Sequence, residues 1–141
     1  MNVYADTSVF VSLYTQDSHS AVAREIMKLN PRMWFTPLHS AEFFHAMAQQ
    51  VFQRRISNVE AERVYDILNR DRVASLWLET AVPERAFEVC ADLARRNGPK
   101  LGVHTLDSLH VACALELKAE RFWTFDERQA KLAKAEGLKA S

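Results

Sequence analysis

Short apolar segments alternate with longer amphipathic ones along this chain, and no other feature of the sequence limits the fold as much. Strand-like segments are predicted at residues 3–5, 33–36, 76–78 and 121–125, with helical patterns between them. Residues 138–140 offer a further, edge strand. Strands that alternate with helices pair in parallel, and right-handed crossovers place helices on both faces of the sheet. We therefore predict a three-layer α/β/α fold with a central parallel sheet of four to five strands.

Start and stop signals divide the helical patterns into separate helices. Asp17-Ser18 offers a cap for a helix that ends at Asn30-Pro31. A helix that opens at Pro83 is predicted to stop at Asn97-Gly98-Pro99, where the glycine suits a left-handed cap. Thr105 is predicted to cap the helix that follows.

The helix predicted from Leu38 to about Arg54 is apolar around most of its circumference. One core face cannot cover such a helix, so it is expected to be buried on more than one side. A second copy of the chain is the natural cover for the remaining side. We therefore expect a homodimer that forms through this helix.

Length and composition limit the class of protein. The 141 residues, 48% of them hydrophobic, can bury one substantial core, and no Pro-, Gly- or Ser-rich linker divides them, so a single domain is expected over residues 1–141. A net charge of zero excludes the basic excess of a permanently bound nucleic-acid protein, but a transient nucleic-acid substrate remains possible. Cys90 and Cys113 form no CxxC pair, which favours a reducing cytoplasm. No signal peptide or membrane span is expected.

Acidic side chains are placed by the predicted topology at one edge of the sheet. Asp6 and Asp126 each follow a strand directly. Asp107 lies in the first turn of a helix before the last strand, and Glu42 lies about one turn into the helix after the second strand. The carboxyl ends of parallel strands meet at the same edge, where open α/β sheets bind ligands. We therefore expect the four carboxylates to share one crevice.

Each of these acids, taken singly, also fits an ordinary structural role. Asp6 and Asp126 are natural helix N-caps, and Gln129 completes a capping box with Asp126. Asp107 suits the positive end of a helix dipole, and Glu42 could be a solvated surface residue. Four carboxylates in one crevice nevertheless repel one another unless a cation lies among them.

Mg²⁺ or Mn²⁺ is the cation that best suits such a site, because both prefer oxygen ligands and bind through a few carboxylates plus substrate phosphates. Zinc suits it less, because the histidines are scattered and His110 with Cys113 lies on an apolar stripe. An all-oxygen acidic site at the edge of an α/β sheet favours metal-assisted displacement at phosphorus.

These segments, in this order and spacing, resemble the PIN-domain ribonucleases, in particular the VapC-like toxins of toxin–antitoxin pairs. The resemblance spans nearly the whole chain. The matching segments are Tyr4-Ala5-Asp6-Thr7-Ser8-Val9, Ser40-Ala41-Glu42-Phe43, Thr105-Leu106-Asp107-Ser108-Leu109-His110-Val111-Ala112-Cys113-Ala114 and Phe122-Trp123-Thr124-Phe125-Asp126.

The resemblance implies a PIN-like fold and a Mg²⁺- or Mn²⁺-dependent endoribonuclease, usually a homodimer and often held inactive by an antitoxin protein. From the site itself, we expect one or two metal ions held by Asp6, Asp107 and Asp126, with Glu42 binding directly or through water, to orient a water for attack on the phosphodiester. The RNA 2′-hydroxyl is then not needed as the nucleophile. The residues that match the family's catalytic, metal-binding quartet are Asp6, Glu42, Asp107 and Asp126. The residues that match its supporting hydroxyls are Thr7 or Ser8, and Thr124.

Two neighbours of the quartet carry weaker expectations. Many family members have an aromatic residue three positions after the last aspartate, where this chain has Gln129, and we expect that difference to affect helix packing more than the metal site. His110 could hydrogen-bond Asp107, although an ordinary core histidine fits its apolar stripe better.

Other classes fit the sequence less well. A haloacid-dehalogenase-like phosphatase needs a second aspartate two residues after Asp6, where this chain has Ser8. A response-regulator receiver needs adjacent acids after the first strand. A non-catalytic PIN-like binding module is the main alternative, and it predicts the loss of at least one acid of the quartet, whereas all four are present.

Overall fold

Four parallel strands form the centre of the computed structural model, which describes residues 1–141. The strands lie in the spatial order β3-β2-β1-β4. Their bounds are β1 (Asn2–Ala5), β2 (Arg32–Phe35), β3 (Leu78–Glu79) and β4 (Arg121–Trp123). Ala140 adds one parallel bridge to Phe122. The predicted α/β fold with four to five parallel strands is confirmed, and the expected edge strand at 138–140 is reduced to this bridge.

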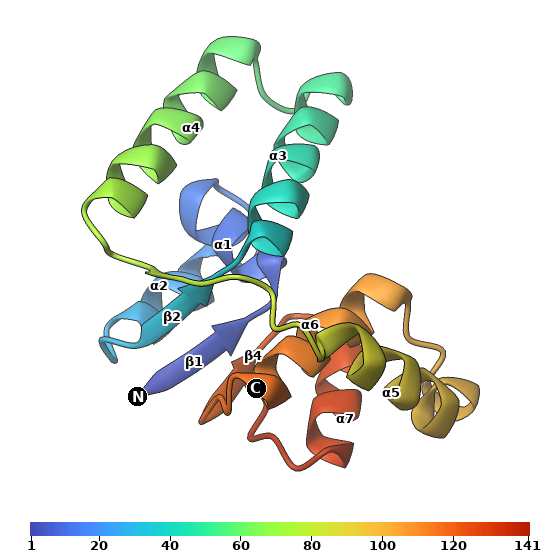
Figure 1. Ribbon diagram of the computed structural model, residues 1–141. Coiled ribbons are helices and arrows are strands. Elements are labelled where there is room, and N and C mark those ends of the chain that lie inside the picture. Colours follow the sequence, from blue (N-terminus) through green and yellow to red (C-terminus); the bar gives the residue numbers. More distant parts are fainter.

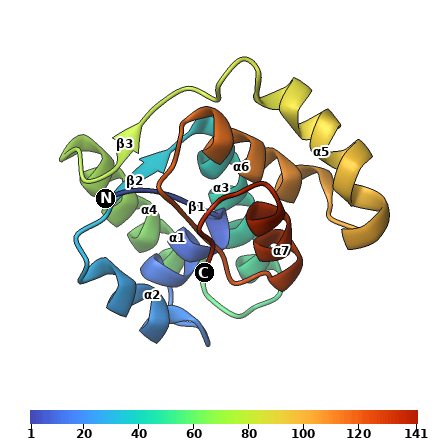
Figure 2. The ribbon, with the colours of Figure 1, turned by 90° about the horizontal axis from the view of Figure 1, so that it is seen from below.

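Seven helices cover the two faces of the sheet (Figures 1 and 2). None of them is both long enough and apolar enough to cross a membrane. Helices α1 to α4 lie on one side and α5 to α7 on the other, which gives the expected three layers. Their bounds are α1 (Thr7–Tyr14), α2 (Ser20–Met27), α3 (Pro37–Phe52), α4 (Asn58–Val73), α5 (Ala86–Leu101), α6 (Thr105–Glu116) and α7 (Glu127–Ala135).

The central strand β1 supplies side chains to both halves of the core. Val3 and Ala5 pack into the cluster beneath α1, α3 and α4, whereas Tyr4 packs into the cluster formed with α5, α6 and α7. All three side chains are fully buried. Successive residues of a strand point to opposite faces, so a strand covered on both sides must be apolar throughout. The end of this buried strand is consequently a rigid position for Asp6.

Helix α3 begins with a capping box and extends away from the sheet beside α4 (Figure 1). Thr36 accepts the backbone N–H of His39, whose imidazole in turn accepts the backbone N–H of Thr36. The buried residues of α3 are only His39, Phe43 and Met47. Phe44 is 40% exposed and Phe52 is 81% exposed. The predicted burial of this helix on several sides is therefore not achieved within one chain.

The predicted stop of α5 at Asn97-Gly98-Pro99 is wrong. The helix continues to Leu101 and ends at Gly102, which has a left-handed φ of 63°. A proline inside a helix leaves the carbonyl four residues earlier without its amide partner. That carbonyl belongs to Arg95, an exposed residue close to the helix end, where water can replace the missing donor. Gly98 therefore lies within the helix, and the glycine that ends it comes four residues later.

Three other predicted boundaries also move. Asp17 does not cap α2 but accepts the backbone N–H of His19 in the preceding turn, and α2 begins at Ser20. Thr105 is the first residue of α6, whose N-cap position is His104. The third strand is Leu78–Glu79, because Trp77 turns into the core and donates its indole N–H to Tyr14.

Candidate functional site

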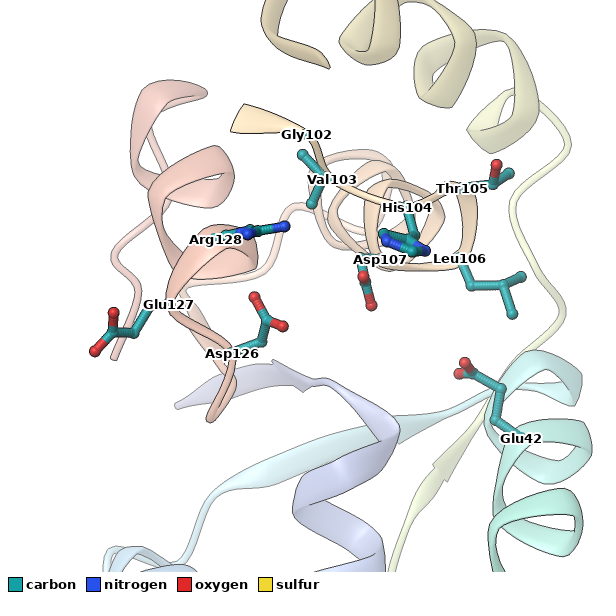
Figure 3. Close-up of a pocket in the computed structure, with 10 residues that line it drawn as sticks. All are labelled: Glu42, Gly102, Val103, His104, Thr105, Leu106, Asp107, Asp126, Glu127 and Arg128. Carbon is teal, nitrogen blue, oxygen red and sulfur yellow. The ribbon is translucent and has the colours of Figure 1, made fainter. Parts of the chain in front are cut away.

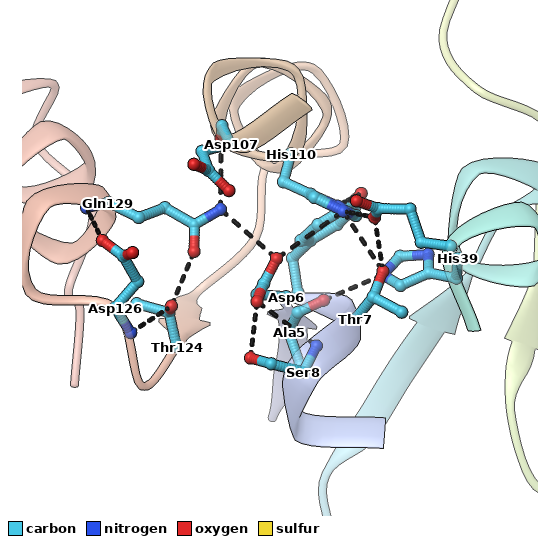
Figure 4. A network of polar contacts seen from close by, with 12 residues as sticks. Ala5, Asp6, Thr7, Ser8, His39, Asp107, His110, Thr124, Asp126 and Gln129 are labelled. Atoms are coloured by element: carbon cyan, nitrogen blue, oxygen red, sulfur yellow. Dashed lines mark hydrogen bonds and ion pairs between the residues drawn. The ribbon is translucent and has the colours of Figure 1, made fainter. Parts of the chain in front are cut away.

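Asp6 lies at the carboxyl end of β1 and serves as the N-cap of α1. Its Oδ2 accepts the backbone N–H of Ser8 at 3.2 Å and the Ser8 hydroxyl at 2.5 Å. The side chain is 13% exposed. The structural role proposed for Asp6 as an N-cap is thus real, but Oδ1 still points into the space between α6 and α7 (Figure 4).

Glu42 reaches the same place from α3. Thr7 donates its hydroxyl to Glu42 Oε1 at 2.7 Å, and the His110 imidazole bonds the same carboxylate oxygen through Nε2. His110 Nε2 also lies 3.6 Å from Asp6 Oδ1. Asp6, Glu42 and His110 thus offer ligand atoms within 4.8 Å of one another, a spacing that can hold a metal ion.

His110 is completely buried on α6, as expected for a core histidine, but it bonds Glu42 and not Asp107. Its Nδ1 lies 2.8 Å from the Tyr4 hydroxyl. Burial raises the pKa of Tyr4 well above its usual value, so the phenol keeps its proton and can donate to Nδ1. Nε2 then carries the imidazole hydrogen and donates it to Glu42. A chain of hydrogen bonds therefore runs from the core to the site.

A second buried histidine supports the strand beneath Asp6. His39 Nδ1 accepts the backbone N–H of Thr36, so its hydrogen must be on Nε2, which donates to the Ala5 carbonyl at 2.8 Å. Burial is the main reason that the pKa of His39 falls to about 3, and His110 contributes further. His39 is therefore neutral at pH 7 and fixes the backbone immediately before Asp6.

Asp107 and Asp126 line the open part of the site together with Glu42. The three carboxylates point into a common cleft of about 770 Å³, whereas Glu127 points away from it (Figure 3). The pKa of Asp107 is raised, first by burial and then by the charges of Asp6 and Asp126. All four predicted acids therefore lie at one edge of the sheet.

A histidine joins the expected carboxylates. We expected Asp6, Asp107 and Asp126 to hold the cation with Glu42 as a direct or water-mediated ligand. Asp6, Glu42 and His110 form the most compact group, and the two other aspartates face it from the cleft (Figures 3 and 4). Both His110 nitrogens already bond Tyr4 and Glu42, so this histidine orients Glu42 and leaves the four acids as the oxygen ligands. The contact of His110 with Glu42 could not be predicted from the sequence, because the residues around His110 on α6 are apolar.

The supporting hydroxyl groups are all near the acids, but each has a different partner. Thr7 bonds Glu42, and Ser8 bonds Asp6. Thr124 accepts the backbone N–H of Asp126 and donates to Gln129. Gln129, whose difference from the family we expected to affect helix packing more than the metal site, is fully buried and donates toward Asp6, so it contacts the site as well as packing α7.

The sequence of the chain matches the family model of the PIN domain over residues 3–135. The chain belongs to the PIN domain family. The match includes every acid of the site, from β1 to the last residue of α7. A comparison with curated proteins finds no significant match.

Solved structures share the fold of this PIN domain at low sequence identity. VapC20 of Mycobacterium tuberculosis, described as a sarcin-ricin loop cleaving toxin, is 16% identical, with a TM-score of 0.70 over 96% of this chain and 95% of its own. VapBC2 of Rickettsia felis, solved bound to a promoter DNA fragment, is 14% identical (TM-score 0.68; 100% and 98% covered). FitAcB of Neisseria gonorrhoeae is 13% identical (TM-score 0.70; 98% and 95% covered).

The charges of this PIN domain site suit a divalent cation. The chain forms several ion pairs with arginine or lysine, but none of them involves Asp6, Glu42, Asp107 or Asp126. The His110 imidazole donates a hydrogen bond to Glu42, and His104 and Arg128 line the cleft without forming an ion pair with any of the four acids. Carboxylates that gather without a compensating side chain favour an external positive charge. Oxygen donors predominate among them, which suits a hard ion such as Mg²⁺ or Mn²⁺.

Proposed function

We propose that the protein is a metal-dependent endoribonuclease that cleaves RNA phosphodiester bonds. One observation carries this proposal: four carboxylates without an arginine or lysine partner gather at the carboxyl edge of a PIN domain sheet, and three of them line a polar cleft. A non-catalytic binding module of the same fold has no need for all four acids, which cost free energy by mutual repulsion.

The residues of the site have different roles in the proposed reaction. Asp6 and Glu42, with Asp107 and Asp126 across the cleft, would hold Mg²⁺ or Mn²⁺. A divalent ion bound there supplies the charge that activates water and stabilises the departing 3′ oxygen. Thr7 and His110 fix the direction of the Glu42 carboxylate, and Ser8 fixes that of Asp6.

The walls of the cleft suit an RNA backbone. Arg128 and His104 line it beside Asp107 and Asp126, and both carry N–H donors that phosphate oxygens accept (Figure 3). We propose that these two side chains contact the phosphates on either side of the bond that is cut. Their contribution would weaken with increasing salt, as phosphate contacts do.

Cleavage of a structured RNA tests the proposed function. The purified protein should cut it with Mg²⁺ or Mn²⁺, stop with a chelator, and leave 5′-phosphate and 3′-hydroxyl ends. Products with 2′,3′-cyclic phosphates would show that the RNA 2′-hydroxyl is the nucleophile and would refute the proposed mechanism. Glu127→Gln is the matched control, because this acid lies beside Asp126 but points away from the cleft.

We further propose that the protein acts as the toxin of a toxin–antitoxin pair and binds a cognate antitoxin. The resemblance to VapC-like toxins supports this role, and so does the fold shared with VapC20 and VapBC2. The neighbouring reading frame is the test. A gene for a small DNA-binding protein immediately upstream supports the role, and its absence favours a nuclease without an antitoxin.

We also propose a homodimer that uses the exposed apolar side of α3. Phe44 and Phe52 remain accessible there, and large exposed apolar side chains on one helix favour association. Phe52→Glu should yield a monomer in analytical ultracentrifugation without altering the fold. A wild-type protein that sediments as a monomer at micromolar concentration would refute this part of the proposal.

A further inference from the structure

Gln129 is completely buried among the carboxylates of the site, although it carries no charge and does not belong to the acidic quartet. It lies in the first turn of α7, three residues after Asp126, and its backbone N–H bonds Asp126 Oδ1 at 2.8 Å. A buried side-chain amide needs an acceptor for its N–H groups and a donor for its carbonyl. The identity of these partners shows what the side chain does.

The hydrogen bonds of Thr124 determine which way the amide faces. Thr124 Oγ1 accepts the backbone N–H of Asp126 at 3.0 Å, and its own hydroxyl hydrogen points to Gln129, 2.6 Å away. The Gln129 atom that meets this hydrogen is therefore the carbonyl oxygen, Oε1. The reverse orientation would place the carbonyl against two other oxygen acceptors and is excluded on that ground.

The amide nitrogen consequently faces the acids. Nε2 donates to Asp6 Oδ1 at 3.4 Å and to the backbone carbonyl of Asp107 at 3.2 Å (Figure 4). A single side chain thus joins the end of β1, the first turn of α6, the segment after β4, and α7. Every polar atom of its amide has a partner.

We propose that Gln129 is a positioning residue that holds the Asp6 carboxylate and the Asp107 backbone at the spacing needed to bind a divalent cation. This inference rests on the proposed metal-dependent function. Asp6 is held through both of its oxygens, Oδ2 by Ser8 and Oδ1 by Gln129. A ligand fixed in advance loses less conformational freedom when the ion arrives, and its affinity for the ion is correspondingly higher.

Calorimetric titration with Mn²⁺ alone tests the inference without any measurement of activity. Gln129→Met keeps the length of the side chain and removes both N–H donors. Residues that orient metal ligands typically contribute about 10- to 100-fold to metal affinity, and we expect a loss of Mn²⁺ affinity in that range. Asn97→Leu is the matched control, because Asn97 donates at 2.9 Å to Glu136, the residue that caps the opposite end of α7 from Asp126. That variant should bind Mn²⁺ like the wild type.

A double-mutant cycle separates positioning from general stabilisation. Thr124→Val removes the hydroxyl that orients the Gln129 carbonyl, so it should weaken Mn²⁺ binding by less than Gln129→Met does. Once the amide is absent, Thr124→Val should lose only its direct contact with the Asp126 backbone, so the combined loss should be smaller than the product of the two single losses. If the two losses multiply instead, or if Gln129→Met lowers the melting temperature in chelator but keeps the wild-type Mn²⁺ affinity, Gln129 is only a structural residue and the inference is overturned.

Two further measurements apply if Gln129→Met does not fold or if the wild type binds no Mn²⁺. If Gln129→Met does not fold, Gln129→Asn replaces it, since the shorter amide stays polar but cannot reach Asp6 and Thr124 together, and it should also weaken Mn²⁺ binding. If the wild type binds no Mn²⁺, the proposed function fails. Crystal structures of the metal-free wild type and the variant then test the positioning role by itself. The Asp6 carboxylate should adopt a different orientation in the variant, and an unchanged orientation overturns the positioning role.

Discussion

The two halves of the acidic site differ in how their carboxylates are hydrogen-bonded. The closed half is formed by Asp6, Thr7, Glu42 and His110, whose polar atoms bond one another and connect to the core through Tyr4. The open half is formed by His104, Asp107, Asp126 and Arg128, which line the cleft that Glu42 borders from the closed half. The Asp126 carboxylate accepts one backbone N–H, and the Asp107 carboxylate accepts none.

This difference teaches how a small domain can hold several like charges in one place. The closed half satisfies its carboxylates with internal donors and so can remain mostly buried. The open half leaves its carboxylates to water, to a cation and, in the proposed reaction, to phosphate groups. We expect substitutions in the closed half to lower both stability and catalysis, and substitutions in the open half to lower catalysis without lowering stability.

The largest expected effect is on turnover. Asp6→Asn should reduce RNA cleavage by orders of magnitude, and it should also destabilise the fold, because an amide in place of Oδ1 or Oδ2 sets N–H groups against the donors of Gln129 or Ser8. Asp126→Asn should reduce cleavage similarly but leave the fold intact, since asparagine is as good an N-cap as aspartate. Single-turnover kinetics and urea denaturation of both variants check this. If both variants lose the same amount of stability, the proposed difference between the closed and open halves is wrong.

The next effect concerns stability in the closed half. His110→Phe keeps an aromatic ring but leaves the Tyr4 hydroxyl without its partner and leaves the Glu42 carboxylate with Thr7 as its remaining donor. A buried polar group without a partner costs about 1–3 kcal/mol, so the free energy of unfolding should fall by at least that amount. Urea denaturation measures it, with His45→Phe on the exposed side of α3 as the control. A His110 variant as stable as wild type would contradict the described hydrogen-bond chain.

A pH effect should come from His39, which supports the closed half. Its pKa falls to about 3 in the folded protein, below the usual value of 6.5, so the unfolded chain binds the proton first. The stability that His39 contributes is therefore complete above pH 6.5 and is lost as pH falls from 6.5 toward 3. His39→Gln should make the melting temperature less sensitive to pH across that window. The number of protons taken up on unfolding should fall by up to one. If the melting temperatures of the wild type and the variant change with pH in parallel, the lowered pKa assigned to His39 is contradicted.

The smallest effect is expected in the open half, without metal. Burial and the neighbouring aspartates raise the pKa of Asp107, so its ionised form costs stability at neutral pH and that cost disappears as pH falls through the folded pKa. Asp107→Asn removes the charge and should raise the melting temperature slightly at pH 7.5 in chelator.

Excess Mg²⁺ completes this last test. It should stabilise the wild type, by about 2.7 kcal/mol at a hundredfold excess over Kd, and stabilise Asp107→Asn less. Glu88→Gln is the control, because Glu88 is also an acid in a first helical turn but lies on α5, away from the site. If Asp107→Asn melts lower than wild type in chelator and Mg²⁺ raises both equally, Asp107 is an ordinary structural acid.

The order of elements and the placement of the acids could be predicted from the sequence because both follow from local rules. Apolar periodicity identified the strands and helices, and parallel pairing then required Asp6 and Asp126 to lie at the same edge. The N-cap roles of Asp6 and Asp126 also depend only on residues within one turn.

The tertiary structure alone decided which side chains complete the site. Gln129 meets Asp6 across 123 positions of the sequence, and His110 meets Glu42 across 68. Local pattern assigned both residues to helix packing, since it records only neighbours within a turn. The end of α5 was mispredicted for a related reason: Pro99 usually stops a helix, but an exposed last turn tolerates it. The sequence by itself therefore determined where the charges gather, and the packing of α6 and α7 against β1 determined what holds them in position.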